Sequence, residues 1–398
     1  MLEEASRRPC ATVNLESTYQ HMETISLDLA SADEASSRLG ISRASLYAYV
    51  SRGLIRSFSS PHDPRQRLYA VDDVETLVAR KARFRRPAVA AATALDWGLP
   101  VLETGIAQIQ DGRLFYRGQD AIALARTATL EDVAKLLVGA MHEDAFLDPS
   151  RIPGPLTGPA FGLHDFVTRA VRVLSEPAPK ETRAAEVAAI LRLTAAAASG
   201  ADPGTMPLHR HLAGAWKASP QAADVIRRAL VLCADHELSS STFAVRVTAS
   251  TGASLRNAVI AGLVTLAGPY HGGMTERVRA FLEDPARAPR PGFRHRLYPE
   301  GDPRAQALLE NVPLLASDAT TWKTLADASG GSPGIDVALV MMERAYGLPT
   351  GAAFTIFAVG RTAGWLAHAV EQRSQAALIR PRARYVAADQ PASQASSP

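Results

Sequence analysis

The sequence predicts a mainly helical protein in which a small basic module precedes a long helical body. Three observations lead to this fold class. From residue 88 onward, long Ala, Leu and Val stretches repeat apolar residues at spacings of three and four, the period of an amphipathic helix. Proline and glycine separate these stretches, as they do between helices. Positive charge gathers in one region, where 43–86 holds ten Lys or Arg against four Asp or Glu.

The overall composition excludes several classes of protein. The chain has 398 residues, of which 47% are hydrophobic and 21% charged, and its net charge is +3. A disordered chain carries fewer apolar residues and more net charge. A chain of this length is expected to form two or three domains. Two cysteines, Cys10 and Cys233, are too few for a disulfide scaffold, so we expect a reduced, cytoplasmic setting.

No segment has the pattern of a membrane span or a signal peptide. The longest apolar run near the middle of the chain is 258–270, and a span needs roughly 20 apolar residues. Residues 1–8 are charged and lead into no apolar run. We therefore expect a soluble protein with no membrane partner.

The first module is predicted over 29–86, after a disordered segment over 1–28. Ser31 and Glu34 have the spacing of a capping box, which marks the first turn of a short helix. Gly40 follows that helix and supplies a turn, because glycine readily takes a positive φ at a helix end.

A second helix is predicted over 43–51, with Ser42 as its cap. The stretch 56–69 is rich in turn residues and predicts a hairpin, and a third helix follows over 72–83. The expected core of the module consists of apolar residues on these helices: Ala35, Leu39, Ile41, Leu46, Val50, Val74, Leu77 and Val78.

The segment 31–81 resembles the winged helix-turn-helix of the MerR type. In that family the second helix lies in the DNA major groove and the hairpin wing touches the backbone. By position, the resemblance implies DNA contacts from the following residues: Arg43, Ser45, Tyr47 and Tyr49 on the helix, and Arg65 and Arg67 on the wing. The net charge of +6 over 43–86, against −3 on the rest of the chain, fits phosphate binding. A module used only for packing or dimer contacts is the alternative.

The long body is predicted over 87–386, after a joint at Arg86-Pro87 and before a disordered tail over 387–398. Its clearest helical stretches are 130–141, 184–198, 222–235 and 254–266. A short hairpin is expected from 101–109 and 113–116, which flank the turn pair Asp111-Gly112.

Candidate chemistry lies where glycine and proline interrupt the helices. His236 stands at a helix end, and His271 lies between Gly-Pro-Tyr and Gly-Gly. Glycines beside a histidine allow close approach of the backbone, and a nearby helix N-terminus favours a neutral imidazole. Asp336 precedes an apolar helix, where burial raises the pKa of a carboxyl and suits it to act as a general base.

Further candidates are His295 and three arginines at apolar helix starts: Arg304, Arg361 and Arg380. A guanidinium matches a carboxylate with two parallel hydrogen bonds, so these arginines are candidate carboxylate clamps. Taken singly, each of these histidines and arginines is more often a helix cap or a side chain reaching to solvent. Their shared occurrence in glycine- and proline-rich segments favours a site.

Five motifs over 101–386 resemble those of the citrate synthase family, and they occur in the family's order. They are "FYRGQDAIALA", "GPYHGG", "GFRHRLYPEGDPRA", "GIDVAL" and "FAVGRTAGWLAH". The resemblance implies a mostly α fold with a large and a small domain, the small domain at about 210–320. It also implies a homodimer that condenses acetyl-CoA, as co-substrate, with oxaloacetate to give citrate and CoA.

The resemblance also implies a role for each candidate residue. Asp336 takes a methyl proton, His271 stabilises the enol or enolate, and His295 acts on the ketone. The substrate carboxylates are held by His236, Arg304 and Arg361, and by Arg380 of the second subunit. No metal or other cofactor is implied, in agreement with the lack of metal-ligand spacing among Cys and His.

The sequence departs from the family pattern before two of these residues. Arg294 stands where the family has Gly, and Pro333-Gly334-Ile335 stands where it has Pro-Asn before the acid. Two other functions therefore stay open. One is a 2-methylcitrate synthase that uses propionyl-CoA, since one methylene changes discrimination by only about 1–3 kcal/mol. The other is a DNA-binding regulator whose body senses citrate, oxaloacetate or acyl-CoA.

Overall fold

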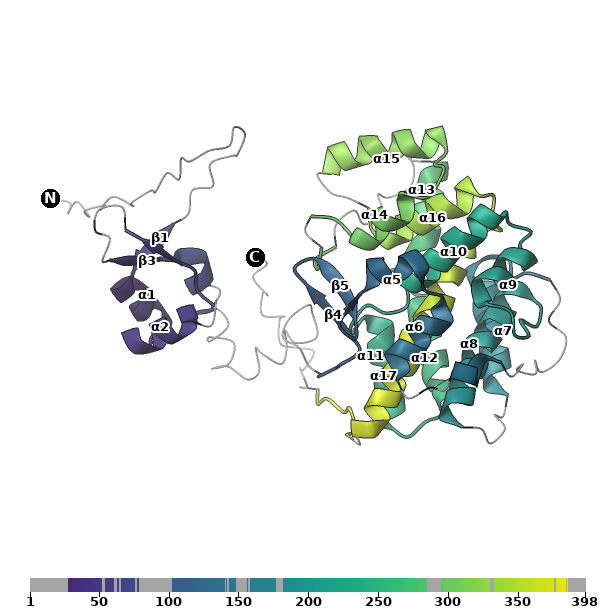
Figure 1. Ribbon diagram of the computed structural model, residues 1–398, viewed down its shortest axis with the longest axis horizontal. Coiled ribbons are helices and arrows are strands. Elements are labelled where there is room, and N and C mark those ends of the chain that lie inside the picture. Colours follow the sequence, from purple (N-terminus) through teal and green to yellow (C-terminus); the bar gives the residue numbers. More distant parts are fainter. Residues whose placement is uncertain are drawn as a thin grey trace. The chain divides into compact units, whose positions relative to one another are not determined.

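The computed structural model describes residues 28–51, 54–60, 63, 66–75, 77–78, 102–139, 141, 143–147, 156, 158–176, 182–284, 295–298, 300–329, 333–375, 377–383 and 385. The chain divides into two compact units, Met1–Glu103 and Thr104–Pro398 (Figure 1). Residues 1–27 of the predicted disordered N-terminal segment, the predicted disordered tail, the joint at Arg86-Pro87, Arg65 and Arg294 lie outside the described residues.

The first unit joins short helices to a three-stranded antiparallel sheet. Its elements are β1 (Leu29–Ser31), α1 (Ala32–Leu39), α2 (Arg43–Ser51), β2 (Ser57–Ser59) and β3 (Arg67–Ala70), and the strand order is β1-β3-β2. The predicted capping box is confirmed, because Ser31 and Glu34 bond each other's backbone N–H. Gly40 ends α1 with φ 58°. Strand β1 was not predicted, since a strand of three residues is too short to show a period.

The core of this unit is close to the predicted one. Ala35, Leu39, Leu46 and Val74 are buried, and Ile55 and Tyr69 join them. The described part of the third helix covers residues 71–75 and 77–78. The antiparallel pairing of β2 with β3 confirms the predicted hairpin. The assignment of this unit to the winged helix-turn-helix class stays a prediction.

The body begins with a small sheet. Strands β4 (Ala107–Gln110) and β5 (Arg113–Tyr116) form the predicted hairpin, with positive φ at both Asp111 and Gly112, and β6 (Gln119–Asp120) adds a third strand. The first strand starts later than predicted, because residues 102–106 form bends and extended chain.

The rest of the body is helical. Its elements are α5 (Ala121–Thr127), α6 (Leu130–Val138), η1 (Glu143–Phe146), α7 (Gly162–Ser175), α8 (Arg183–Ser199), α9 (Leu208–Ala215), α10 (Pro220–Leu232), α11 (Ser240–Ser250), α12 (Leu255–Leu266), α13 (Met274–Glu283), α14 (Pro303–Leu309), α15 (Ala316–Ser329), α16 (Ile335–Ala345) and α17 (Ala352–Gln375). Side-chain caps fix the first turns of several helices; those of α8, α10 and α12 come from Thr182, Ser219 and Ser254.

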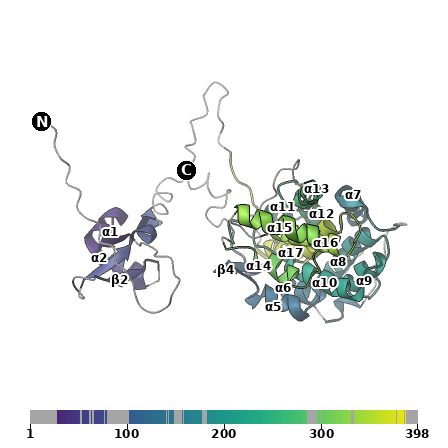
Figure 2. The ribbon, with the colours of Figure 1, turned by 90° about the horizontal axis from the view of Figure 1, so that it is seen from above.

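Helix α17 is the centre of the body, and nearly all of its residues are buried. It packs against α6, α10, α11, α12 and α16, which surround it in both views (Figures 1 and 2). A Cβ at Gly360 would lie 2.6 Å from the carbonyl oxygen of Leu230, so α10 approaches α17 closely at a position where a side chain would clash. Gly364 donates its backbone N–H to Ala234 at 3.0 Å. The loop that follows α10 is therefore held directly on α17.

In the described part of the chain, none of the helices has the length and apolar character needed to cross a membrane. The same residues hold no group of three His, Cys, Asp or Glu placed to bind a metal ion.

Candidate functional site

Two of the predicted histidines lie against each other. His236 follows α10, and its ring meets that of His295 edge to face, with 5.1 Å between centroids. Tyr298 joins them, because its hydroxyl lies 3.0 Å from Nε2 of His236 and its backbone N–H donates to the carbonyl of His295. This cluster connects the end of α10 with the short turn before α14.

Burial and nearby cations keep these histidines neutral. His236 is 7% exposed, and its burial, together with the charges of Arg304 and Arg361, lowers its pKa well below the ordinary value. Burial and Arg304 also lower the pKa of His295. Burial raises the pKa of Tyr298 to about 12, so its hydroxyl keeps its hydrogen. Near pH 7 the cluster therefore offers neutral hydrogen-bond donors and acceptors.

Arg304 is fixed by an acid two residues before it. Its Nε donates to Oδ1 of Asp302 at 2.9 Å and its Nη2 to Oδ2 at 2.7 Å, and both residues are almost fully buried. The guanidinium also lies over the ring of Tyr298 at 5.5 Å. Burial alone would raise the pKa of Asp302, but the charge and hydrogen bonds of Arg304 hold that pKa below its ordinary value.

Asp336 is the second residue of α16. The residue as a whole is partly exposed, yet its Oδ1 atom is buried and has no hydrogen-bond partner among the described residues. Burial raises the pKa of this carboxyl to about 7, against the opposing charge of Arg304. A carboxyl that gains and loses its proton near neutral pH is suited to general acid–base chemistry.

His271 lies in a tight turn after α12. The turn needs its glycines: a Cβ at Gly273 would lie 2.5 Å from a carbonyl oxygen, and one at Gly272 would meet Leu266 at 2.7 Å. The Nε2 atom of His271 lies 2.8 Å from the hydroxyl of Ser241 on α11. Burial, and then the charge of Arg361, lower the pKa of His271 to about 3. The imidazole is therefore neutral at physiological pH.

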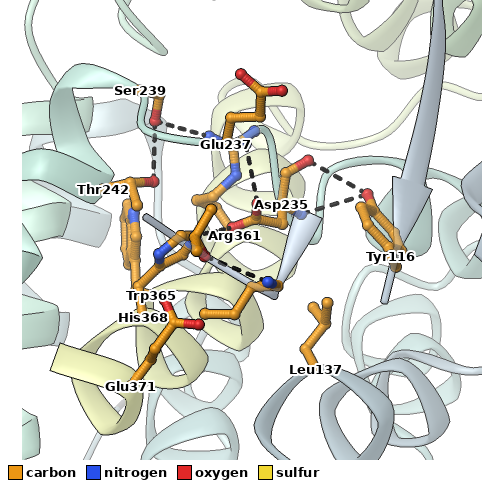
Figure 3. A network of polar contacts seen from close by, with 12 residues as sticks. Tyr116, Leu137, Asp235, Glu237, Ser239, Thr242, Arg361, Trp365, His368 and Glu371 are labelled. Carbon is orange, nitrogen blue, oxygen red and sulfur yellow. Dashed lines mark hydrogen bonds and ion pairs between the residues drawn. The ribbon is translucent and has the colours of Figure 1, made fainter. Parts of the chain in front are cut away.

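Arg361 projects from the middle of α17 and is 1% exposed. Its Nε donates to the carbonyl of Cys233 at 2.9 Å and its Nη1 to the hydroxyl of Ser239 at 3.3 Å (Figure 3). Its guanidinium lies over the ring of Phe357, and the ring of His271 meets the same phenylalanine edge to face. Burial lowers the pKa of Arg361, and no carboxylate forms an ion pair with it among the described residues.

The structure thus brings together most of the predicted site residues from five parts of the chain. Contacts and electrostatic effects connect this set: His236, His271, His295, Arg304, Asp336 and Arg361. Arg380 does not join them within one chain. It is exposed on the extended segment 377–383, after α17.

Four polar residues of the site were not predicted. Ser239, Ser241, Tyr298 and Asp302 each bond a predicted residue. The run of serines at 239–241, which begins three residues after His236, could have indicated Ser239 and Ser241 from the sequence. Asp302 stands two residues before Arg304, where an acid can both cap α14 and reach the guanidinium.

The predicted DNA-contacting residues have mixed surroundings. Ser45 and Tyr47 are exposed on α2, Tyr47 to 53%. Arg43 forms an ion pair with Asp33 at the start of α1. Arg67 donates to the hydroxyls of Ser57 and Ser59 on the neighbouring strand. Tyr49 is partly buried and packs against the core of the unit.

A carboxyl with a raised pKa, neutral histidines that are buried or half-buried, and two buried arginines lie together inside a helical body, an arrangement suited to acid–base chemistry on an anionic molecule. Residues 167–382 match a family model described as citrate synthase, C-terminal domain. This match covers more than half of the chain, and the chain belongs to the citrate synthase family.

Relatives with curated names include citrate and 2-methylcitrate synthases. Citrate synthase of Haloferax volcanii is 36% identical over 189 residues, which are 41% of this chain and 50% of the relative. Citrate synthase 2 of Bacillus subtilis is 33% identical over 198 residues, or 43% and 53%. 2-Methylcitrate synthase 2 of Corynebacterium glutamicum is 32% identical over 190 residues, or 41% and 50%. The chain spans about half the length of the curated relatives it matches.

Solved structures agree on the fold. Citrate synthase from Thermotoga maritima superposes with a TM-score of 0.61 at 21% identity, over 74% of this chain and 95% of that one. Citrate synthase from Thermoplasma acidophilum, solved as a ternary complex with carboxymethyl coenzyme A and oxaloacetate, superposes with a TM-score of 0.56 at 22% identity, over 75% of this chain and 96% of that one.

Proposed function

We propose that the protein condenses acetyl-CoA with oxaloacetate and water to give citrate and CoA. One observation carries this proposal: the Asp336 carboxyl, with its buried and unpartnered oxygen, is electrostatically coupled to both Arg304 and Arg361. A weakly acidic methyl group needs a base of raised pKa, and a dicarboxylate needs cations. Family membership supports the same reaction class.

In the first step, Asp336 removes a proton from the methyl group of the thioester. Negative charge then develops on the thioester oxygen, where a neutral imidazole N–H stabilises it. Trp365 donates its indole N–H to the Ser241 hydroxyl at 3.3 Å, and that hydroxyl has its own hydrogen to give to Nε2 of His271. The Nδ1 atom of His271 then carries a hydrogen for the thioester oxygen.

In the second step, the methyl carbon forms a bond to the ketone carbon of oxaloacetate. His295 gives a proton to the ketone oxygen as this bond forms. The substrate carboxylates are held by His236, Arg304 and Arg361. The lowered pKa values of His236 and His295 keep both imidazoles neutral, so the positive charge that binds the carboxylates comes from the two arginines. Water then cleaves the carbon–sulfur bond of the citryl thioester, and the CoA thiol leaves.

Arg380 belongs to this proposal through a second copy of the chain. Its exposed position on 377–383 leaves the guanidinium free to enter the site of a partner in a homodimer. The same proposal includes a large and a small domain within the body, no cofactor besides the acyl-CoA co-substrate, and a cytoplasmic setting.

The test is release of the CoA thiol by the purified full-length protein. Oxaloacetate is added with acetyl-CoA or propionyl-CoA in parallel, and Asp336→Asn is the control. Oxaloacetate-dependent release that the control lacks supports the condensation, and the faster acyl group distinguishes citrate from 2-methylcitrate formation. Equal release with and without oxaloacetate contradicts it.

The second candidate function is DNA binding by the first unit, alone or as a regulator whose body senses citrate, oxaloacetate or acyl-CoA. The observation that favours it is an exposed face of α2, with Ser45 and Tyr47 accessible in a region of net charge +6. Selection from random duplexes and fluorescence anisotropy provide the test. Binding should weaken steeply with salt and with Tyr47→Ala. Affinity that is indifferent to both rejects this candidate.

A further inference from the structure

Behind the substrate-binding residues lies a second polar network that the proposed reaction does not use. Its centre consists of Asp235 after α10, Arg246 on α11 and His368 on α17, each with 0% exposure. Figure 3 shows Asp235 and His368 close to Arg361, with Glu371 on the same helix. Charged groups buried this deeply lower the stability of a protein unless they are paired, so a functional role is expected to account for their presence.

Hydrogen bonds of Arg246 fix the tautomer of His368. Its Nε and Nη2 donate to Gln372 and Gln375 at 2.8 Å, and its Nη1 donates to Glu371 at 2.7 Å. The same Nη1 lies 3.4 Å from Nδ1 of His368. An arginine only donates, so Nδ1 is the acceptor and the hydrogen of a neutral His368 is on Nε2.

That Nε2 atom faces Asp235. It lies 3.2 Å from Oδ2, which is an ion-pair distance, and neither atom has a hydrogen-bond partner among the described residues. The other oxygen, Oδ1, accepts the backbone N–H of Glu237, whose φ is +49°. Asp235 therefore holds the strained turn that carries His236, and the His368 ring lies against the second oxygen of Asp235.

Asp235 also acts on Arg361. The negative charge of Asp235 is the largest influence that opposes the effect of burial on the pKa of Arg361. The two residues nevertheless form no ion pair, and the bonds of Arg361 go to the Cys233 carbonyl and Ser239. Asp235 thus supplies countercharge while its carboxylate stays with His368.

We propose that His368 is a positioning residue that keeps the Asp235 carboxylate away from Arg361, so that Arg361 stays open to a carboxylate of the substrate. This inference rests on the proposed function, in which Arg361 binds oxaloacetate or citrate. Without His368, the orphaned carboxylate of Asp235 turns to the nearest cation and competes with the substrate.

The experiment is isothermal titration of the full-length protein with citrate and with oxaloacetate, combined with thermal melts. His368→Phe should weaken both affinities at least tenfold. His368→Gln, whose amide N–H reaches toward Asp235, should stay within about threefold of the parent. His209→Phe removes another buried imidazole, on α9, and should leave both affinities unchanged.

The decisive variant is the double replacement Asp235→Asn with His368→Phe. An amide cannot compete as an anion, so the double variant should bind citrate more tightly than His368→Phe alone. If His368→Phe does not fold, His368→Asn takes its place, because its oxygen still accepts from Arg246 and nothing reaches Asp235.

A double variant no tighter than the single one, or parental affinity in His368→Phe, overturns the inference. A parent protein that binds neither citrate nor oxaloacetate contradicts the proposed function instead, before any variant is made.

Discussion

Asp302 accepts the backbone N–H of Ile335 at 3.1 Å, so the carboxylate that grips Arg304 also fastens the first turn of α16. Asp336 is the next residue along that turn. Arg304, the candidate cation for a substrate carboxylate, and Asp336, the candidate base, are therefore joined through the one buried acid Asp302. Asp302 raises the pKa of Asp336, and Arg304 lowers it.

The activity should depend on the ionisation of Asp336. Its pKa of about 7 predicts that kcat/KM rises with pH through about 7, as the base loses its proton, and then levels off. His271, with a pKa of about 3, should add no titration between pH 5 and 9. Initial rates with both substrates well below KM provide the profile. A flat profile over pH 6–8 would contradict the assignment of the base.

Asp302→Asn should move that profile to lower pH. The substitution removes a negative charge that raises the pKa of Asp336, and it leaves the opposing charge of Arg304 less neutralised. Both changes favour the ionised form of Asp336. The matched control is Asp318→Asn, which breaks another buried acid–arginine pair, with Arg344 at the far end of α16. If the midpoint of the pH profile is unchanged in the Asp302 variant, or moves equally in the control, the proposed effect of Asp302 on the pKa of Asp336 is contradicted.

Asp336→Asn should abolish condensation and stabilise the fold. The pKa of this carboxyl is about 7 in the folded chain against an ordinary 3.8. Ionisation therefore costs folding free energy that builds up between pH 4 and 7 and is complete above pH 7. A neutral amide avoids this cost, so the variant should gain about 2–4 kcal/mol at pH 8 and little near pH 4. Urea unfolding at the two pH values measures the difference, and equal stability at pH 8 would contradict the burial of the charge.

The helices of the body follow from the sequence more closely than the contacts of the site. The stretch predicted over 184–198 is observed as α8, Arg183–Ser199, because apolar spacing and a threonine cap act within a few residues. The helix predicted over 222–235 stops at Leu232, and the loop over 233–239, which is bonded to α17, presents Asp235 and His236. The carbonyl of Ala234 in this loop accepts the backbone N–H of Gly364, far along the chain, a contact that no local pattern specifies.

Site partners required the fold itself. His236 and Tyr298 are separated by 62 residues, and Ser241 and Trp365 by 124. No local pattern specifies such pairs, since they exist only once α10, α11 and α17 have packed. Arg43 shows the same limit on the surface, where its ion pair with Asp33 depends on the packing of α1 and α2.

Ser241→Ala should lower kcat with little change in either KM. The hydroxyl contacts only protein groups, which are Nε2 of His271, the indole of Trp365 and the hydroxyl of Ser239. Its loss frees His271 to turn and leaves the buried indole N–H without an acceptor. Loss of such a buried partner costs about 1–3 kcal/mol, or roughly 5- to 150-fold in rate if the cost falls on the transition state.

The matched control is Thr248→Ala on the same helix, where the hydroxyl bonds only the carbonyl of Ala244. It should keep the parental kcat. A Ser241→Ala variant that changes KM alone would contradict the proposed orientation of His271.

Tyr116→Phe should destabilise the body, because a single hydroxyl joins the hairpin to the loop that carries the site. The Tyr116 hydroxyl lies 3.0 Å from the carbonyl of Val231 and 3.3 Å from the backbone N–H of Asp235, and it is fully buried (Figure 3). Removing it leaves the buried backbone N–H of Asp235 without this acceptor, which costs about 1–3 kcal/mol of the free energy of unfolding. Tyr346→Phe is the control, since that hydroxyl bonds the Asn311 carbonyl near the surface and its loss should cost about 0.5 kcal/mol or less. Urea unfolding distinguishes the two, and equal losses would mean that the buried hydroxyl of Tyr116 does not fasten the loop.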